Sequence, residues 1–298
     1  MVNGRFLREK SLRMSKDLFS TGIRPHVDDY LLKKSQEKRD YGEYWSASSA
    51  GYCMRKLIFE RLGVPSVNED ARKTRIFESG HVFHSWIQNI TKEAGLSIAQ
   101  ELELQDEKLM IRGHIDDLIL LKEEPFVDYD EDDQGAETIL DGSSRIILYD
   151  YKTAHSKSFH WAKKNGTKMS HYHKMQLGTY MYMLRNLKQP QLMGGEVILT
   201  DKLKEARILK ISKDDLCMDE TQLMWSSGLE KEVVQYWSTL NGYWKAKQVP
   251  KCTCADFEGG FMAREAYNPF FYDGEPCSLK WLSLQMKKGL LKNENTEV

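Results

Sequence analysis

Two apolar runs, Leu109–Leu121 and Arg145–Thr153, most constrain the fold, because each has the length and Ile/Leu content of one β-strand. The first run contains the segment G-H-I-D, which ends at Asp116, and the second contains D-Y-K, from Asp150 to Lys152. Side chains alternate along a strand, so Asp150 and Lys152 project from one face about 7 Å apart. If the two strands are neighbours, two carboxylates and an ammonium group meet, as in a divalent-metal site for phosphodiester hydrolysis. Taken alone, D-x-K is more often a surface ion pair.

Two further motifs flank these strands. Gly80 and His84 form G-x-x-x-H in a predicted helix over 78–94. Gln176 and Tyr180 share a face of a second predicted helix, Lys174–Leu187, because they are four residues apart. The apolar side of the first helix is predicted to comprise Val82, Phe83, Trp86, Ile87 and Ile90.

The four motifs in this order resemble the RecB-like branch of the PD-(D/E)XK nuclease superfamily, and especially its CRISPR-associated and phage-type exonucleases. The resemblance covers roughly Ser46–Tyr180 together with cysteines near the C-terminus. It implies an α/β fold: a restriction-endonuclease-like core with a central mixed sheet flanked by helices, and N- and C-terminal segments joined at a cysteine cluster. Asp150 stands where many relatives carry Glu, and the superfamily tolerates both.

The resemblance also implies a role for each motif residue. The ligands of Mg²⁺ or Mn²⁺ would be His84, Asp116, Asp150 and the carbonyl of Tyr151; Lys152 would orient the attacking water; and Gln176 and Tyr180 would position the phosphate or the lysine. His81 is a weaker candidate than His84, and Glu101 is an additional acid near the metal. Asp117 is predicted to point away from the face of Asp116.

The function that follows is a metal-dependent DNA exonuclease acting on single-stranded ends, in recombination, repair, or phage or CRISPR DNA processing. One alternative is a DNA-end-binding component of a recombination or spacer-acquisition complex with little turnover of its own, whose partners are the other proteins of that complex. The intact set of Asp116, Asp150 and Lys152 argues against it. A second alternative, a structural metalloprotein with an accidental D-x-K, is disfavoured by the four ordered motifs.

Charge is distributed unevenly along the chain. The 298 residues have a net charge of −1, but Glu123–Asp141 holds nine acidic residues and no Lys or Arg. The remainder carries 43 basic against 35 acidic residues, a mildly basic balance that suits a DNA-binding surface. The acidic stretch is interpreted as an insertion over 122–143 between the two strands. A solvated loop is favoured over a phosphate mimic that competes with DNA.

The segment Thr153–Lys174 has the opposite character, since it contains no acidic residue, four histidines and interleaved aromatic rings. Cations that follow a backbone and rings on which bases stack are what a single-strand channel requires. The DNA-binding candidates are Lys157, Trp161, Lys163, Lys164 and Lys168. The alternative is an exposed loop whose rings pack locally, and the histidine spacing alone does not favour a zinc site.

Four cysteines are candidate metal ligands: Cys53, Cys252, Cys254 and Cys277. The last three lie in turn-rich sequence after prolines, and the resemblance supplies the link to Cys53. It implies an iron–sulfur cluster, [4Fe–4S], although the C-x-C spacing departs from the family. Zn²⁺ on the same thiolates and the absence of any metal remain as alternatives. Cys217 is predicted to be a small buried apolar residue.

The whole chain, residues 1–298, is expected to form a single nuclease domain. Residues 1–44 form a helical extension with a break near Pro25, 45–212 the nuclease core, 213–286 a helical and cysteine-bearing region, and 287–298 a frayed tail. A hairpin of Gly195–Leu199 and Ala206–Ile211 is predicted to close the sheet, and Asp214–Lys247 is predicted to be helical. The absence of an apolar run of eighteen residues and the charged N-terminus favour a cytoplasmic protein without a membrane partner.

Overall fold

The computed structural model describes residues 22–36, 42–67, 71–122, 144–164, 169–187, 191–193, 196–198, 203–255 and 268–288. The predicted acidic insertion over 122–143 lies outside the described residues except for its first residue, which ends β3 (Ile111–Lys122), and Lys168 and the tail after 288 also lie outside them.

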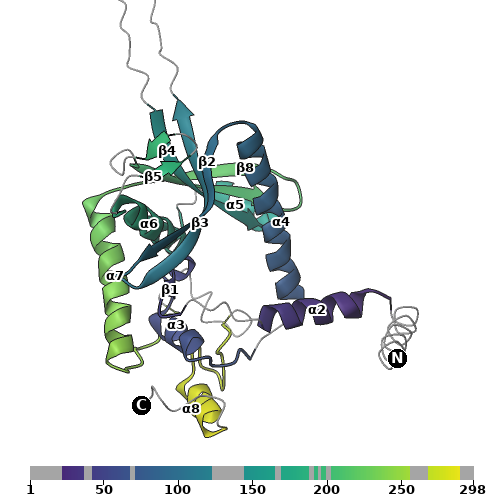
Figure 1. The fold of residues 1–298 in the computed structure, drawn as a ribbon. Helices are drawn as coiled ribbons and strands as arrows, with labels where there is room; N and C mark the ends of the chain where they lie inside the picture. The colour runs from purple at the N-terminus through teal and green to yellow at the C-terminus, as the bar shows by residue number, and fades with distance from the viewer. Residues whose placement is uncertain are drawn as a thin grey trace, which may run out of the picture.

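The chain alternates helices and strands (Figure 1). The helices are α2 (Arg24–Gln36), the short 3₁₀ helix η1 (Ala47–Ser49), α3 (Met54–Arg61), α4 (Ala71–Glu93), α5 (Ser156–Lys164), α6 (His171–Arg185), α7 (Ser227–Lys245) and α8 (Leu279–Lys287). The strands are β1 (Trp45–Ser46), β2 (Ser97–Asp106), β3 (Ile111–Lys122), β4 (Ser144–Ala154), β5 (Gln191–Met193), β6 (Glu196–Ile198), β7 (Glu205–Ser212) and β8 (Met218–Met224). Pro25 lies in the first turn of α2, where its missing N–H has no helical acceptor, so the predicted break is the start of this helix.

The central sheet is mixed, with the order β1-β3-β4-β7-β8 and β2 paired to β3. The pairs β2–β3, β3–β4 and β7–β8 are antiparallel, whereas β1–β3 and β4–β7 are parallel. Strand β2 follows one edge of β3 over residues 111–119. The other edge is shared by β1, at 111–112, and β4, at 117–122. Among the described strands, residues 113–116 of β3 therefore have no partner on that edge, and we call this gap the fork.

Helices cover both faces of the sheet, which confirms the α/β class with a mixed central sheet (Figure 1). On one face, α6 and α7 pack with residues such as Leu148 and Ile208 in the main core. On the other, α4 packs through Ile87 against Ile147 and Tyr151. Residues 146–151 of β4 alternate between these two cores, as a strand buried on both faces requires. Gly178 permits the contact of α6 with α7, because a Cβ there would lie 2.8 Å from Leu229.

Three sequence predictions about these elements were wrong. Strand β7 pairs with β4 and β8 rather than with the 195–199 segment, where β6 pairs with β5. Residues 218–224 form strand β8 rather than helix, because β7 offers them an open edge whose hydrogen bonds outweigh local propensity. On α4, Val82, Trp86 and Ile90 are exposed, and the helix turns a more polar stripe toward the sheet.

Candidate functional site

The fork places Asp116, the first predicted acid, beside the backbone of β4 at Tyr151, the residue after the second predicted acid, Asp150. Because the β3–β4 ladder ends at the pair Asp117–Tyr149, the N–H of Tyr151 has no strand carbonyl from β3 to bind. The side chain of Asp116 takes that place, and its Oδ2 accepts the Tyr151 N–H at 2.6 Å. His84 of α4 lies over the same carboxylate, with Nδ1 3.6 Å from Oδ2. The predicted residues His84 and Asp116 are therefore in contact.

Asp150 lies on the α6 face of β4 and is only 2% exposed. Its Oδ1 accepts hydrogen bonds from Lys152 Nζ, at 2.8 Å, and from Gln176 Nε2, at 2.9 Å. Its Oδ2 is buried, and no described residue donates to it. A buried carboxylate oxygen without a donor is costly, so this atom is suited to a cation.

The electrostatics of the site are dominated by burial and by two nearby acids. Burial, together with the charge of Asp150, raises the pKa of Asp116 to about 7. Burial by itself lowers the pKa of Lys152, but the carboxylates of Asp150 and Asp116 outweigh it and raise that pKa, so the lysine stays charged. Burial and the charge of Lys152 lower the pKa of His84, which keeps its imidazole neutral and able to act as a metal ligand.

These donors fit Mg²⁺ or Mn²⁺, since carboxylate oxygens with one imidazole are suitable ligands for such ions. The donorless Oδ2 of Asp150 and the raised pKa of Asp116 are both relieved by a cation. Within the described part of the chain, the ligand atoms of His84, Asp116 and Asp150 do not all lie within 4.8 Å of one another. One ion bound by all three requires a side chain to turn toward it.

The two remaining motif residues have different surroundings. Gln176 is buried and donates to Asp150, so its amide orients this carboxylate and does not face an open substrate site. The ring of Tyr180 packs on β3 at Gly113, where a Cβ would lie 3.0 Å from the ring and 2.8 Å from Ala47. Gly113 is thus required for the close approach of α6 and η1 to the fork.

Asp117 has a separate set of partners, but the prediction that it points away from the face of Asp116 was wrong, because both acids lie toward α4. Asp117 is fully buried and accepts hydrogen bonds from Thr91 of α4, at 2.6 Å, Ser97, at 2.5 Å, and the Tyr151 hydroxyl, at 2.9 Å. The strand is irregular here, since Ile115 and Leu118 both belong to the main core and strict alternation would put them on opposite faces. Glu101, opposite Asp116 on β2, has a φ of +48° and is skipped in the ladder.

Sequence reasoning missed two polar residues near the acids. Gln88 of α4 donates to the Asp116 carbonyl, at 3.0 Å, and to Glu101, at 2.8 Å, so it connects the predicted additional acid to the fork. His173 of α6 interacts electrostatically with Lys152 and Asp150. Burial and the charge of Lys152 lower its pKa to about 4. The sequence did contain a signal for His173: it lies three residues before Gln176 and therefore on the same face of the predicted helix.

Most of the basic segment is helical rather than a loop. Helix α5 carries Lys157, Trp161, Lys163 and Lys164, all of them exposed, with Trp161 66% exposed. The helix packs on the sheet through Phe159, which is buried. Four of the five DNA-binding candidates are therefore on one exposed helix, and the fifth, Lys168, is outside the described residues.

The four predicted cysteines form one cluster, in which all four sulfur atoms lie within 4.8 Å of one another. Cys53 precedes α3, and the other three come from the C-terminal segment that packs beside it with α8 (Figure 1). The Sγ atoms of Cys53 and Cys252 are 3.9 Å apart, and those of Cys254 and Cys277 are 3.6 Å apart. The predicted joining of N- and C-terminal segments at cysteines is thus present.

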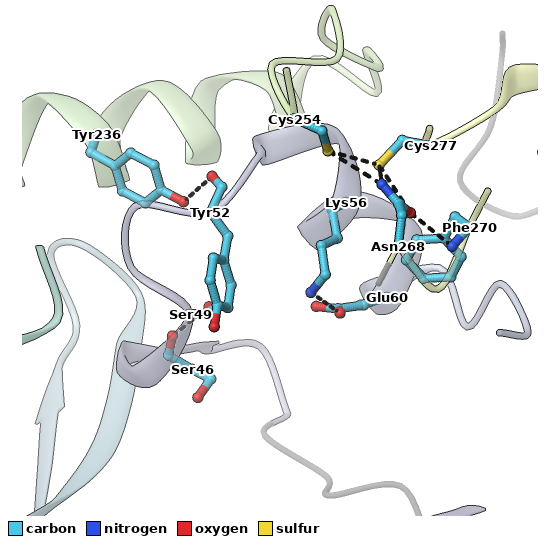
Figure 2. A network of polar contacts seen from close by, with 10 residues as sticks. All are labelled: Ser46, Ser49, Tyr52, Lys56, Glu60, Tyr236, Cys254, Asn268, Phe270 and Cys277. Carbon is cyan, nitrogen blue, oxygen red and sulfur yellow. Dashed lines mark hydrogen bonds and ion pairs between the residues drawn. The ribbon is translucent and has the colours of Figure 1, made fainter. Parts of the chain in front are cut away.

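Backbone and amide groups surround these sulfurs. Asn268 Nδ2 donates to Sγ of Cys254, at 3.4 Å, and of Cys277, at 3.5 Å (Figure 2). The Thr253 N–H donates to Sγ of Cys53 at 3.4 Å. Hydrogen bonds from the neighbouring cysteines lower the pKa of the Cys53 thiol. Cys217 is not part of the cluster: it is exposed in the β7–β8 turn, and the prediction that it is buried was wrong.

Comparisons with known proteins gave remote likenesses in structure alone. No family model matches the chain, and no curated protein matches its sequence. Among solved structures, it is similar to SSO0001, with a TM-score of 0.42, 14% identity, and coverage of 75% of this chain and 87% of that one. It is also similar to the alkaline exonuclease LHK-Exo from Laribacter hongkongensis (TM-score 0.41, 14% identity, coverage 69% and 89%). LHK-Exo in complex with dAMP gives a TM-score of 0.41 at 13% identity, with coverage of 70% and 90%.

None of the helices in the described ranges is long and apolar enough to cross a membrane.

Proposed function

We propose that this protein is a metal-dependent nuclease that hydrolyses DNA phosphodiester bonds, acting as an exonuclease on single-stranded ends. The observation that carries the proposal is Asp150, a buried carboxylate with one oxygen bound to Lys152 and Gln176 and the other without a donor. Asp116, whose pKa is raised to about 7, lies near enough for the two carboxylates to repel each other. A cation bound at such a pair lowers the pKa of a coordinated water and neutralises charge on the phosphate.

The residues of the chain divide the remaining work. Asp116, Asp150 and the Tyr151 carbonyl hold the divalent ion, Mg²⁺ or Mn²⁺, and His84 completes the ligand set. Lys152 stays protonated and, from its position beside Asp150, orients the attacking water and offsets phosphate charge. Gln176 fixes the rotamer of Asp150 by binding Oδ1, which leaves Oδ2 for the ion. The exposed lysines and Trp161 of α5 contact the DNA strand.

The proposal is tested by incubating the purified protein with end-labelled single- and double-stranded DNA in Mg²⁺, Mn²⁺ or chelator. We expect shortening of single strands from their ends with metal and none with chelator. Asp116→Ala, prepared in parallel, controls for a contaminating nuclease and should be inactive with an unchanged far-UV spectrum. Equal cleavage by wild type and Asp116→Ala would falsify the assignment. Binding of DNA ends without cleavage under every metal condition would support the end-binding alternative instead.

For the cysteine cluster we propose one structural Zn²⁺ ion in place of the [4Fe–4S] cluster that the family resemblance implies. Four thiolates at about 2.3 Å from one tetrahedral ion lie about 3.8 Å apart, and the two measured sulfur pairs are 3.9 and 3.6 Å apart. In a [4Fe–4S] cluster each thiolate binds a different iron at a different corner, which holds the sulfurs further apart. The limit of 4.8 Å for all four sulfurs therefore favours a single ion.

Metal analysis of anaerobically purified protein tests this assignment. We expect about one equivalent of zinc per chain and a colourless preparation. A brown preparation with broad absorption near 400 nm and four equivalents of iron would identify the cluster instead. Protein that folds and keeps its thermal stability with neither metal would overturn both.

A further inference from the structure

A pocket of about 340 Å³ opens beside the carboxylate site, between α5, the start of α6, and strands β7 and β8. Its lining includes Phe159 and Lys163 of α5, His173 of α6, Lys210 of β7, and Thr221 and Gln222 of β8. We call it the α5 pocket. It has the volume of a small-molecule site, and apolar and polar side chains converge in it.

The α5 pocket is continuous with the carboxylate site. Lys210 is the register partner of Lys152 in the parallel β4–β7 pair, so the two lysines lie on adjacent strands about 4.8 Å apart. His173 interacts electrostatically with Lys152, Asp150 and Lys210, which places it between the acids and the pocket. If the scissile phosphate of a DNA strand lies at Asp150, the neighbouring nucleotide of that DNA strand is therefore within reach of this pocket.

The charges on the pocket wall indicate how a nucleotide would lie. Lys163 and Lys210 have no hydrogen bond or ion pair to any residue that the structure describes. They form the α5–β7 side, where a phosphate would be neutralised. Asp219, the cross-strand partner of Lys210, lies on the β8 side of the pocket, which disfavours a second phosphate there. Glu220 projects from the opposite face of β8, where Arg207 binds it at 3.0 Å.

The β8 side offers hydrogen bonds to a base instead. Thr221 carries a hydroxyl on the pocket face of β8, because its register partner is Ile208 of the main core. The side chain of Gln222 points to the opposite face, where its Nε2 lies 3.3 Å from Sδ of Met224. Phe159, Met169 and Ile208 supply an apolar floor. A neutral, planar base fits such a wall better than an acidic or a purely apolar ligand does.

We propose that the α5 pocket binds the nucleotide next to the scissile phosphate, with its phosphate at Lys163 and Lys210 and its base against the apolar floor and the Thr221 hydroxyl. The proposal rests on the nuclease function proposed above, because that function supplies the strand. It assigns substrate contacts to β7 and β8, which the four sequence motifs do not include.

The test measures binding of thymidine 5′-monophosphate to the full chain by calorimetry in chelator, where no hydrolysis occurs. We expect Lys210→Ala to weaken binding about tenfold, the loss of one charge-assisted hydrogen bond, and Thr221→Val, which removes only the hydroxyl, to weaken it severalfold. Lys231→Ala, which removes an exposed lysine of α7, should leave binding unchanged. Thermal melting confirms that all three variants are folded.

The same variants are then assayed for cleavage of short single strands. We expect Lys210→Ala and Thr221→Val to raise KM while kcat changes less, since the acids and Lys152 are intact. Wild-type cleavage with KM and mononucleotide affinity unchanged in both variants would overturn the pocket and leave the nuclease function standing. Absent wild-type cleavage with affinity reduced in both variants would overturn the nuclease function, and the pocket would stand as a nucleotide site.

Discussion

The carboxylate site and the cysteine cluster are both polar centres in apolar surroundings, but they are built in opposite ways. The carboxylate site is formed by strands β3 and β4 with helices α4 and α6, and its charges are left unbalanced: Asp150 has an oxygen without a donor, and Asp116 has a raised pKa. In the cysteine cluster, loops from distant parts of the chain converge, and the sulfurs bind one another, Asn268 and the Thr253 N–H. Unbalanced charge on a rigid frame suits a reaction, whereas a closed set of ligands suits a structural role.

The two centres meet at consecutive residues. Tyr52 adds to the raised pKa of Lys152, after the larger effects of burial and the two acids, and Cys53 is a member of the cluster. The Tyr52 carbonyl is held by the hydroxyl of Tyr236 on α7 at 2.7 Å (Figure 2). Loss of the cluster is therefore expected to affect the reaction site indirectly, through this short segment, and a set of substitutions can separate the two roles.

The largest effect is expected at Lys152. Lys152→Ala should reduce cleavage by on the order of 10³-fold, since the water loses its positioning cation, while DNA binding with metal changes little, because one cation among many contributes little to phosphate affinity. Single-turnover cleavage and filter binding measure the two effects separately. If both fall by the same factor, Lys152 is a DNA-contact residue and the reaction site must be assigned elsewhere.

The second effect concerns stability. Cys254→Ser should lower the free energy of unfolding by about 4 kcal/mol, as expected for loss of a structural metal, and should release the bound ion. Cys217→Ser is the matched control, because this cysteine is exposed and outside the cluster. Cleavage per folded molecule should fall only severalfold in Cys254→Ser. A complete loss of cleavage in folded protein would show that the cluster takes part in the reaction.

The third effect depends on pH. The folded pKa of Asp116, about 7, lies above its ordinary value of 3.8, so the folded state binds this proton more tightly than the unfolded chain does. Metal-free wild type should therefore lose stability relative to Asp116→Asn as pH rises from about 4 to 7, by at most about 1.4 kcal/mol per pH unit, with no further change above. Urea unfolding in chelator measures this difference. Parallel stability curves would mean that Asp116 titrates normally.

The smallest effect is expected at the neighbouring acid. Asp117→Asn replaces an acceptor of three short hydrogen bonds with an amide that must present its NH₂ to donors. We expect a loss of about 1–3 kcal/mol, the cost of a buried unsatisfied group, and little change in cleavage per folded molecule. Glu107→Gln, in the exposed β2–β3 turn, is the control. Strongly reduced cleavage in folded Asp117→Asn would place this residue in the reaction site.

The sequence by itself determined the strands and the identity of the residues they carry. The apolar runs around Asp116 and Asp150 predict strands because their periodicity is local, and the spacing of Gln176 and Tyr180 predicts a shared helical face for the same reason. The meeting of Cys53 with the later cysteines followed from a family resemblance, since no local pattern links residues two hundred positions apart.

Tertiary structure decided everything that depends on how strands share edges. The fork at residues 113–116 exists because β1 and β4 share one edge of β3, and a pairing register is not encoded in one strand alone. Pairing between strands also explains the strand at 218–224, where the open edge of β7 outweighs local propensity. It likewise accounts for the broken alternation of side chains between Ile115 and Leu118. On α4 the apolar stripe predicted from periodicity is largely exposed, because the sheet beneath carries Asp116 and Asp117 and requires Gln88 and Thr91 as hydrogen-bond donors.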